Sequence, residues 1–208
     1  MHRFMWKRTL SMIGSPALAL GTALILGSPA AAQSIFINEV HYDNEGKDSG
    51  EVVEVAGPAQ VSLSGWQLVF YNGKNGRPYR TLALEGSIPN LQNGHGTLSF
   101  DAKGIENGAP DGIALVNPDH EVIHFISYEG TFTASSGLAA GLVSQDVGVK
   151  ESDTTLPYQS IQLKGAGQTL ADFKWAKPSP ATPGSVNQEQ IFSNSKKKEA
   201  ADLATRTQ

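Results

Sequence analysis

The chain has 208 residues, with 22 glycines, 11 prolines, no cysteine and only 17% charged residues. That length corresponds to about one domain, and the composition disfavours a coiled coil and favours a turn-rich domain built from β-strands. The lack of cysteine excludes a disulfide framework, a thiol nucleophile and any cysteine-ligated metal site.

The first 32 residues have the pattern of a secretory signal peptide. Three basic residues precede a mostly apolar run over 10–26, and the small-residue pattern SPAAAQ follows, so we expect cleavage between Ala32 and Gln33. The alternative is an uncleaved membrane anchor, but Pro16 and several glycines interrupt the run, which is short for a spanning helix. The sequence therefore predicts a secreted or periplasmic protein.

Cleavage also changes the charge of the chain. Loss of the three basic residues takes the formal net charge from −4 to −7. An acidic exported chain is a poor candidate for nucleic-acid binding, because neutralising phosphates requires a basic face.

Residues 33–190 read as one domain of short strands. The segment 34–42 alternates with β-branched residues, and a strict period of two would place Ile37, Glu39 and His41 on one face. Turn-forming residues separate the further expected strands, which lie at 51–57, 66–72, 79–84, 96–100, 111–117, 121–128 and 160–163. This spacing predicts an antiparallel β-sandwich or barrel.

The end of the chain changes in character. Three prolines, Pro178, Pro180 and Pro183, close the expected domain, and residues 191–208 are predicted to be a flexible tail. The lysine run Lys196–Lys198 in this tail is either a solvated terminus or a contact for an acidic partner.

Residues 120–124 spell HEVIH, which matches the H-E-x-x-H motif of zinc metalloproteases. That motif chelates zinc only on a helix, where histidines four residues apart share one face. Here His120 follows a turn signal and His124 lies among β-forming residues, so a strand would hold the two imidazoles about 13 Å apart. We therefore expect a chance match. The chain also lacks a nucleophile elbow, a P-loop and a dinucleotide-binding fingerprint, so we expect no catalytic residue.

An acidic loop provides the weak metal candidates, Asp43, Glu45, Asp48 and Glu51. Asp43 and Glu54 occupy the first and twelfth places of an EF-hand spacing, but Asp48 stands where the sharp turn needs glycine. Loose Ca²⁺ binding by a loop of the sandwich is one hypothesis, and a solvated loop that keeps the protein soluble is the other. No other cofactor is expected.

Several ordered motifs resemble the lamin tail domain family, particularly its bacterial exported branch. They are an apolar strand ending in Asn38-Glu39, a polar loop, a strand with Glu51 and Glu54, and the Leu-Ser-Gly-Trp turn over 63–66. Downstream, PDGIALVN, FISYEG, QSIQL and WAKPSPATPGSVN extend the similarity over about 35–188.

This resemblance implies an immunoglobulin-like β-sandwich with no catalytic residues to carry over. It indicates an exported, non-catalytic binding or structural module that acts at the cell envelope or outside the cell, with a protein or an envelope polymer as partner. The alternative is an accessory subunit, or a divergent member, of exported metal-dependent nucleases or phosphoesterases, because lamin tail domains in bacteria often accompany such enzymes.

Overall fold

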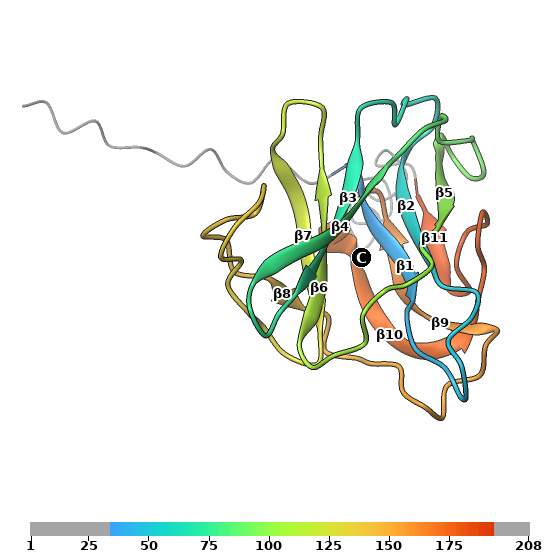
Figure 1. Ribbon diagram of the computed structural model, residues 1–208. Helices are drawn as coiled ribbons and strands as arrows, with labels where there is room; N and C mark the ends of the chain where they lie inside the picture. The colour runs from blue at the N-terminus through green and yellow to red at the C-terminus, as the bar shows by residue number, and fades with distance from the viewer. Residues whose placement is uncertain (1–33, 194–208) are drawn as a thin grey trace, which may run out of the picture. The chain divides into compact units, whose positions relative to one another are not determined.

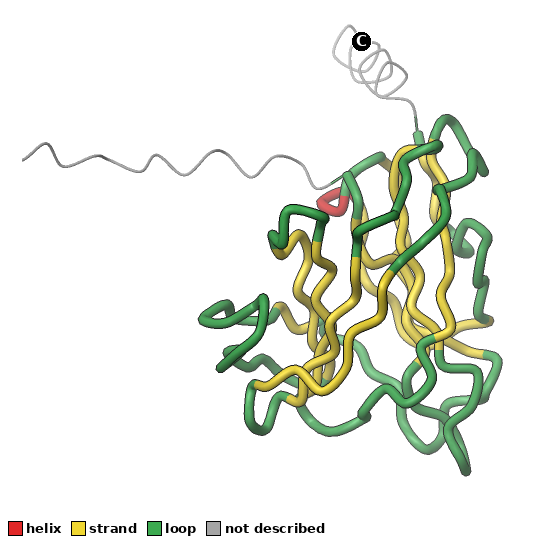
Figure 2. The backbone as a smooth tube through the Cα atoms, turned by 45° about the horizontal axis from the view of Figure 1, so that its top comes forward, coloured by secondary structure: helices red, strands yellow, loops and turns green. Residues whose placement is uncertain are grey.

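A computed structural model of the protein describes residues 34–193. The expected signal peptide and the lysine run of the expected tail lie outside this range. Two β-sheets make up the described part, and its only helical element is the short 3₁₀ turn η1 (Leu170–Asp172), red in Figure 2. The predicted all-β, two-sheet architecture is confirmed, whereas the immunoglobulin-like assignment stays a prediction.

The first sheet lies on the right in Figure 1 and has the strand order β10-β9-β1-β2-β5, with antiparallel neighbours. A short further strand, β11, pairs in parallel with the end of β9. The bounds of these strands are β1 (Phe36–His41), β2 (Val52–Pro58), β5 (His95–Asp101), β9 (Gln159–Gly167), β10 (Phe173–Pro180) and β11 (Gln190–Phe192).

The second sheet has the order β4-β3-β6-β7-β8 and is antiparallel except for the parallel pair β7 and β8. Its strands are β3 (Gln67–Asn72), β4 (Arg77–Ala83), β6 (Asp111–Val116), β7 (Val122–Tyr128) and β8 (Gln145–Asp146). All the strands expected from the sequence are therefore present, and β8, β10 and β11 are additional.

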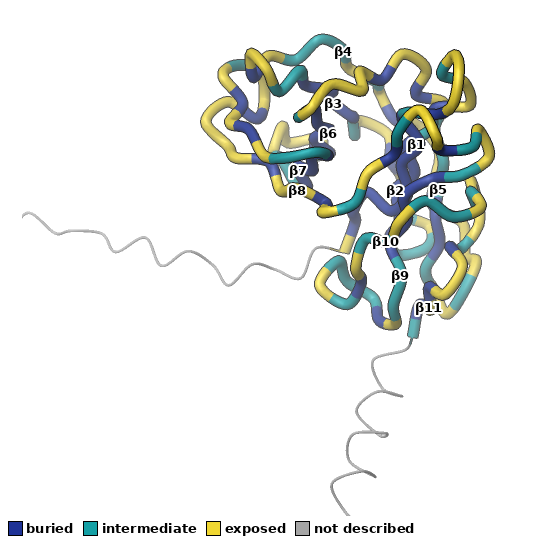
Figure 3. Tube along the Cα trace, turned by 90° about the horizontal axis from the view of Figure 1, so that it is seen from below, coloured by how far each residue is buried: buried dark blue, intermediate teal, exposed yellow. Residues whose placement is uncertain are grey.

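Apolar side chains are buried on both faces of each sheet. The main cluster lies between the sheets and joins residues such as Val53 and Val55 of β2 to Phe70 of β3 and Ile113 of β6. A smaller cluster covers the outer face of the second sheet, and another, which includes Phe36, covers the outer face of the first. Figure 3 shows β1, β2 and β6 mostly buried and most of the loops exposed. This double burial explains why several strands are continuous apolar runs rather than alternating ones.

A β-bulge in β1 corrects the expected alternation. The pairing with β2 runs from Ile37 opposite Val55 directly to Glu39 opposite Glu54, so Asn38 is the extra residue. Ile37 and Val40 consequently both face the main core. Glu39 and His41 therefore do not share the face of Ile37, as a strict period of two had predicted.

The chain after β10 forms a segment that we call the strap, residues 181–193. It crosses the outer face of the first sheet and ends in β11, where Phe192 is fully buried. The folded domain thus continues past the expected boundary at residue 190, and the first residues assigned to the flexible tail belong to the sheet.

Candidate functional site

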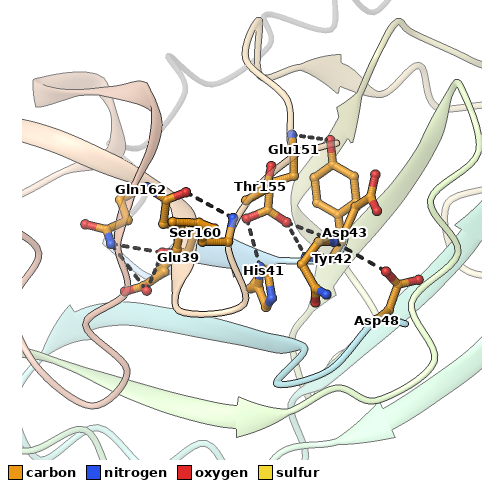
Figure 4. A network of polar contacts seen from close by, with 12 residues as sticks. Glu39, His41, Tyr42, Asp43, Asp48, Glu151, Thr155, Ser160 and Gln162 are labelled. Carbon is orange, nitrogen blue, oxygen red and sulfur yellow. Dashed lines mark hydrogen bonds and ion pairs between the residues drawn. The ribbon is translucent and has the colours of Figure 1, made fainter. Parts of the chain in front are cut away.

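Two buried polar clusters lie next to each other along β1, as Figure 4 shows. Glu39 and Glu54 come from motifs that the sequence analysis singled out, and each cluster includes hydrogen-bond partners more than 100 residues away along the chain. The first cluster is the glutamate pair, Glu39 and Glu54, and the second is built around His41 and Glu151.

Glu39 is fully buried and accepts hydrogen bonds from both β9 and the strap. Its Oε1 accepts from the Ser160 hydroxyl at 2.6 Å and from the Thr182 backbone N–H at 2.8 Å. Its Oε2 lies 2.8 Å from the Thr182 hydroxyl. The carboxyl group therefore joins three segments of the chain.

Glu54 stands opposite Glu39 on β2 and is also fully buried. It accepts from the Asn38 side-chain amide at 3.0 Å and from the Gly184 backbone N–H at 2.6 Å. Burial, and after it the charge of Glu39, raises the pKa of Glu54 to about 8. The pair thus holds a proton at neutral pH.

The second cluster ties the end of β1 to the segment after β8. His41 Nδ1 lies 3.0 Å from Glu151 Oε1, and Nε2 lies 3.1 Å from the Ser49 carbonyl oxygen. Glu151 Oε2 also accepts the backbone N–H groups of Tyr42, at 2.6 Å, and Asp43, at 2.9 Å. Burial by itself lowers the pKa of His41, but the hydrogen bond and charge of Glu151 outweigh it, and the pKa is raised.

This histidine and glutamate have the geometry of a base and its orienting group, but they face inward. The His41 side chain is 1% exposed, and its Nε2, the atom that would act on a substrate, is bonded to the Ser49 carbonyl. The arrangement therefore fastens the loop after β1 rather than presenting a base to solvent.

Beside this cluster lies an acidic hollow of about 380 Å³, whose lining includes Asp43, Asp48, Glu129, Lys150 and Asp153. Lys150 pairs with Glu129 at 3.1 Å. Burial raises the pKa of Asp43, the hydrogen bond from Asn107 opposes this rise, and the neighbouring carboxylates add to it. The hollow therefore concentrates negative charge at one end of the sandwich.

The structure places the four calcium candidates in three different surroundings. Asp43 and Asp48 line the hollow, whereas Glu45 is exposed outside it. Glu51 is buried, and its two oxygens accept the backbone N–H groups of Gly104 and Ile105 at 2.8 and 2.7 Å. Within residues 34–193, no three acidic or histidine side chains stand close enough together to chelate a metal ion.

The HEVIH residues are also separated. His120 occupies an exposed turn with φ of 64°, and His124 is buried in β7, which is a strand as predicted. Nδ1 of His124 accepts the Ile37 backbone N–H at 3.2 Å, so this nitrogen carries no hydrogen. Burial lowers the pKa of His124 to about 4, which keeps the ring neutral as an acceptor.

A different kind of surface lies on the loop between β7 and β8. Residues 131–145 carry no charged side chain, and Leu138, Leu142 and Val143 are 41%, 45% and 65% exposed. The sequence analysis missed this surface, although an uncharged stretch with three large apolar residues in an acidic chain was a signal for it.

Comparison with known proteins gives no match: no family model, no curated protein and no solved structure is significantly similar to this chain. In residues 34–193 there is also no helix with the length and apolar character needed to span a membrane.

Proposed function

We propose that the protein is an exported, non-catalytic binding module of the lamin-tail type, and that the loop 131–145 is its contact surface. The leader-like residues 1–32 and the motif resemblance support export and the family. The inward-facing carboxylates and His41 support a non-catalytic binding role. Their hydrogen-bonding atoms hold the domain together and are not presented to a substrate.

The exposed apolar loop carries the proposal. Large apolar side chains that gather on a monomer's surface are typical of interaction sites. The loop is also held rigidly: the Tyr71 hydroxyl accepts the Ala139 N–H at 2.9 Å, and the Ser135 hydroxyl donates to the Asn75 carbonyl at 2.8 Å. A pre-ordered loop loses little conformational entropy when it binds, which favours affinity from a small surface.

The test is capture of a partner from the producing cell's envelope and culture medium on immobilised protein. The variant carries Leu138→Ser, Leu142→Ser and Val143→Ser together, and the matched control carries Leu91→Ser, which changes a 42% exposed leucine elsewhere. We expect capture to fall about tenfold in the triple variant, which corresponds to a combined loss of about 1.4 kcal/mol over the three side chains. Equal capture by both variants would contradict the proposed surface.

The enzyme alternative is tested on the same preparation. We expect no hydrolysis of DNA or phosphoesters with Mg²⁺, Mn²⁺ or Ca²⁺. Metal-dependent hydrolysis that disappears in Asp43→Ala would overturn the non-catalytic assignment and move the function to the acidic hollow.

A further inference from the structure

The first half of the strap is attached to the first sheet through the glutamate pair, whereas β11 at its end is held by pairing with β9 and by backbone bonds of Phe192 to the side chains of Gln92 and Asn93. Glu39 accepts the Thr182 N–H and lies against the Thr182 hydroxyl, while Glu54 accepts the Gly184 N–H. Side-chain amides complete the attachment, because Asn187 Nδ2 donates to the carbonyls of Asn38 and Leu163. Breaking the bonds to the two carboxyl groups would release the first half of the strap.

The glutamate pair has no cationic partner. Directly opposite positions on antiparallel strands hold their Cβ atoms about 4.5–5.5 Å apart, so two ionised carboxylates here would repel each other in a buried site. Uncharged groups face the pair from every packed element. They are Asn38 of β1, Thr97 of β5, Ser160 and Gln162 of β9, and Thr182 and Gly184 of the strap, while Gln190 of β11 bonds to Asn38.

The charged and titratable side chains nearby have other partners. His41, two residues along β1, is bonded to Glu151, and Lys164 of β9 pairs with Glu189 of the strap at 3.1 Å. His95 of β5 stacks on Phe192 with ring centroids 5.5 Å apart. None of these three side chains donates a hydrogen bond to Glu39 or Glu54.

A count of hydrogens places one proton on the pair. The Thr182 hydroxyl lies 2.8 Å from Glu39 Oε2 and 3.1 Å from Asn187 Oδ1. Asn187 Nδ2 already donates to two carbonyls, so Oδ1 must be the atom that faces Thr182. One hydroxyl hydrogen serves only one of these two acceptors, and both contacts are satisfied when Glu39 Oε2 carries a hydrogen and donates it to Thr182.

Burial and the neighbouring charge also raise the pKa of Glu54, so the pair keeps one proton between its two carboxyl groups. Two coupled carboxyl groups titrate as a unit, and either placement leaves one negative charge on the pair.

We propose that the strap is a conformational latch, which stays closed while the glutamate pair shares a proton and opens when both carboxyl groups are ionised. A second buried negative charge has no cation to compensate it, and the Thr182 hydroxyl then loses the donor that completes its bonding. Opening lifts Val186 from the apolar cluster of Phe36, Ala56, Leu163 and Phe173 on the outer face of the first sheet, while β11 stays paired with β9. This latch is independent of the binding loop 131–145, which belongs to the other sheet.

The test is hydrogen exchange of the purified protein between pH 6 and 9.5, with rates corrected for intrinsic exchange. Amides in the first half of the strap, residues 181–187, are compared with those of β6, at the centre of the second sheet. As the pH rises towards 8 we expect strap protection to fall by up to about tenfold per pH unit, the dependence set by loss of one proton on opening, and to level off above pH 8, while it stays below the protection of β6 at every pH.

The decisive variant is Glu39→Gln. A glutamine amide at this position reproduces the protonated carboxyl, because its oxygen accepts from Ser160 and its nitrogen donates to the Thr182 hydroxyl. The pair then reaches one negative charge and no more, so we expect the strap to stay protected up to pH 9.5. Glu51→Gln is the matched control, since it neutralises a buried carboxylate that touches Gly104 and Ile105 and should keep the wild-type pH dependence.

Three results would overturn the latch. They are strap protection that does not change with pH, equal protection of the strap and β6 at every pH, which means that the strap opens only in global unfolding, and a Glu39→Gln strap that keeps the wild-type pH dependence. The first two are decided on the wild-type protein, so the test stands even if Glu39→Gln does not fold.

Discussion

At the scale of single residues, buried carboxylates in this protein connect segments of backbone. Glu51 accepts two backbone N–H groups and is 7% exposed. We predict that Glu51→Gln lowers the free energy of unfolding by about 2 kcal/mol, because one charge-assisted bond is lost and an amide N–H₂ then faces a backbone N–H. Urea unfolding measures this. Glu45→Gln, an exposed change in the same loop, is the control and should stay within about 0.5 kcal/mol of the wild type.

For Asp43, in the acidic hollow, we predict that removal of the negative charge stabilises the protein, whereas it destabilises the protein at Glu51. Its neighbours Asp48, Asp153 and Glu129 repel its negative charge, so Asp43→Asn should raise the melting temperature at low ionic strength. If the hollow takes Ca²⁺ as a weak extracellular site does, with Kd near 1 mM, then 10 mM Ca²⁺ should raise the wild-type melting temperature by about 4 °C.

Differential scanning calorimetry with Ca²⁺ or EDTA separates the calcium candidates. The Ca²⁺ effect should disappear in Asp43→Asn and persist in Glu51→Gln, because Asp43 lines the hollow and Glu51 does not. An unchanged wild-type melting temperature at 10 mM Ca²⁺ would remove the loop as a calcium site.

At the scale of elements, the loop 131–145 depends on β3 for its shape. Tyr71→Phe removes the hydroxyl that accepts the buried Ala139 N–H. We predict a loss of about 1–2 kcal/mol of stability and faster hydrogen exchange over 137–143 than elsewhere, since the unpaired N–H favours local opening. The control is Tyr158→Phe, at a 62% exposed tyrosine. Equal exchange in both variants would show that the loop is held by other contacts.

The elements that the sequence predicted correctly are those with a local signal. Alternation or apolar runs between turn residues located β1 to β7 and the core of β9. The bulge at Asn38 has no such signal, because it depends on how β1 pairs with β2, and it reversed the faces expected for Glu39 and His41. β10 was missed because its prolines argued against a strand, yet at the edge of a sheet proline is tolerated.

The candidate site was less predictable because its contacts, like the bulge, depend on how distant parts of the chain pair. Glu39 and Glu54 were singled out from the resemblance, but their strap partners lie 143 and 130 residues further along the chain. Nothing in a local pattern specifies that Thr182 or Gly184 will cover them. The acidic loop appeared as one group in the sequence, whereas folding turned Glu51 inward and left Asp43 and Asp48 on the hollow.

At the scale of the whole molecule, the buried titratable groups have opposite effects on how the stability changes with pH. The folded pKa of His124, about 4, lies below the ordinary value of 6.5, so its contribution is complete above pH 6.5 and is lost as the pH falls towards 4. The folded pKa of Glu54, about 8, lies above its ordinary value of 4.5, so its contribution is complete below pH 4.5 and is lost as the pH rises towards 8. The raised pKa of His41 acts in the same direction as Glu54.

Global stability should therefore be greatest between about pH 4.5 and 6.5 and should decline towards pH 8, which urea unfolding at a series of pH values measures. His124→Asn keeps an acceptor near Nδ1 but does not titrate, so it should remove up to about 3 kcal/mol of the pH dependence between pH 6.5 and 4 while leaving the alkaline decline intact. Glu54→Gln should remove the alkaline decline and leave the pH dependence between pH 6.5 and 4 intact. Stability that rises continuously from pH 5 to 8 would mean that Glu54 is ionised in the folded protein at neutral pH, and that its charge is compensated by a partner other than the groups that surround it here.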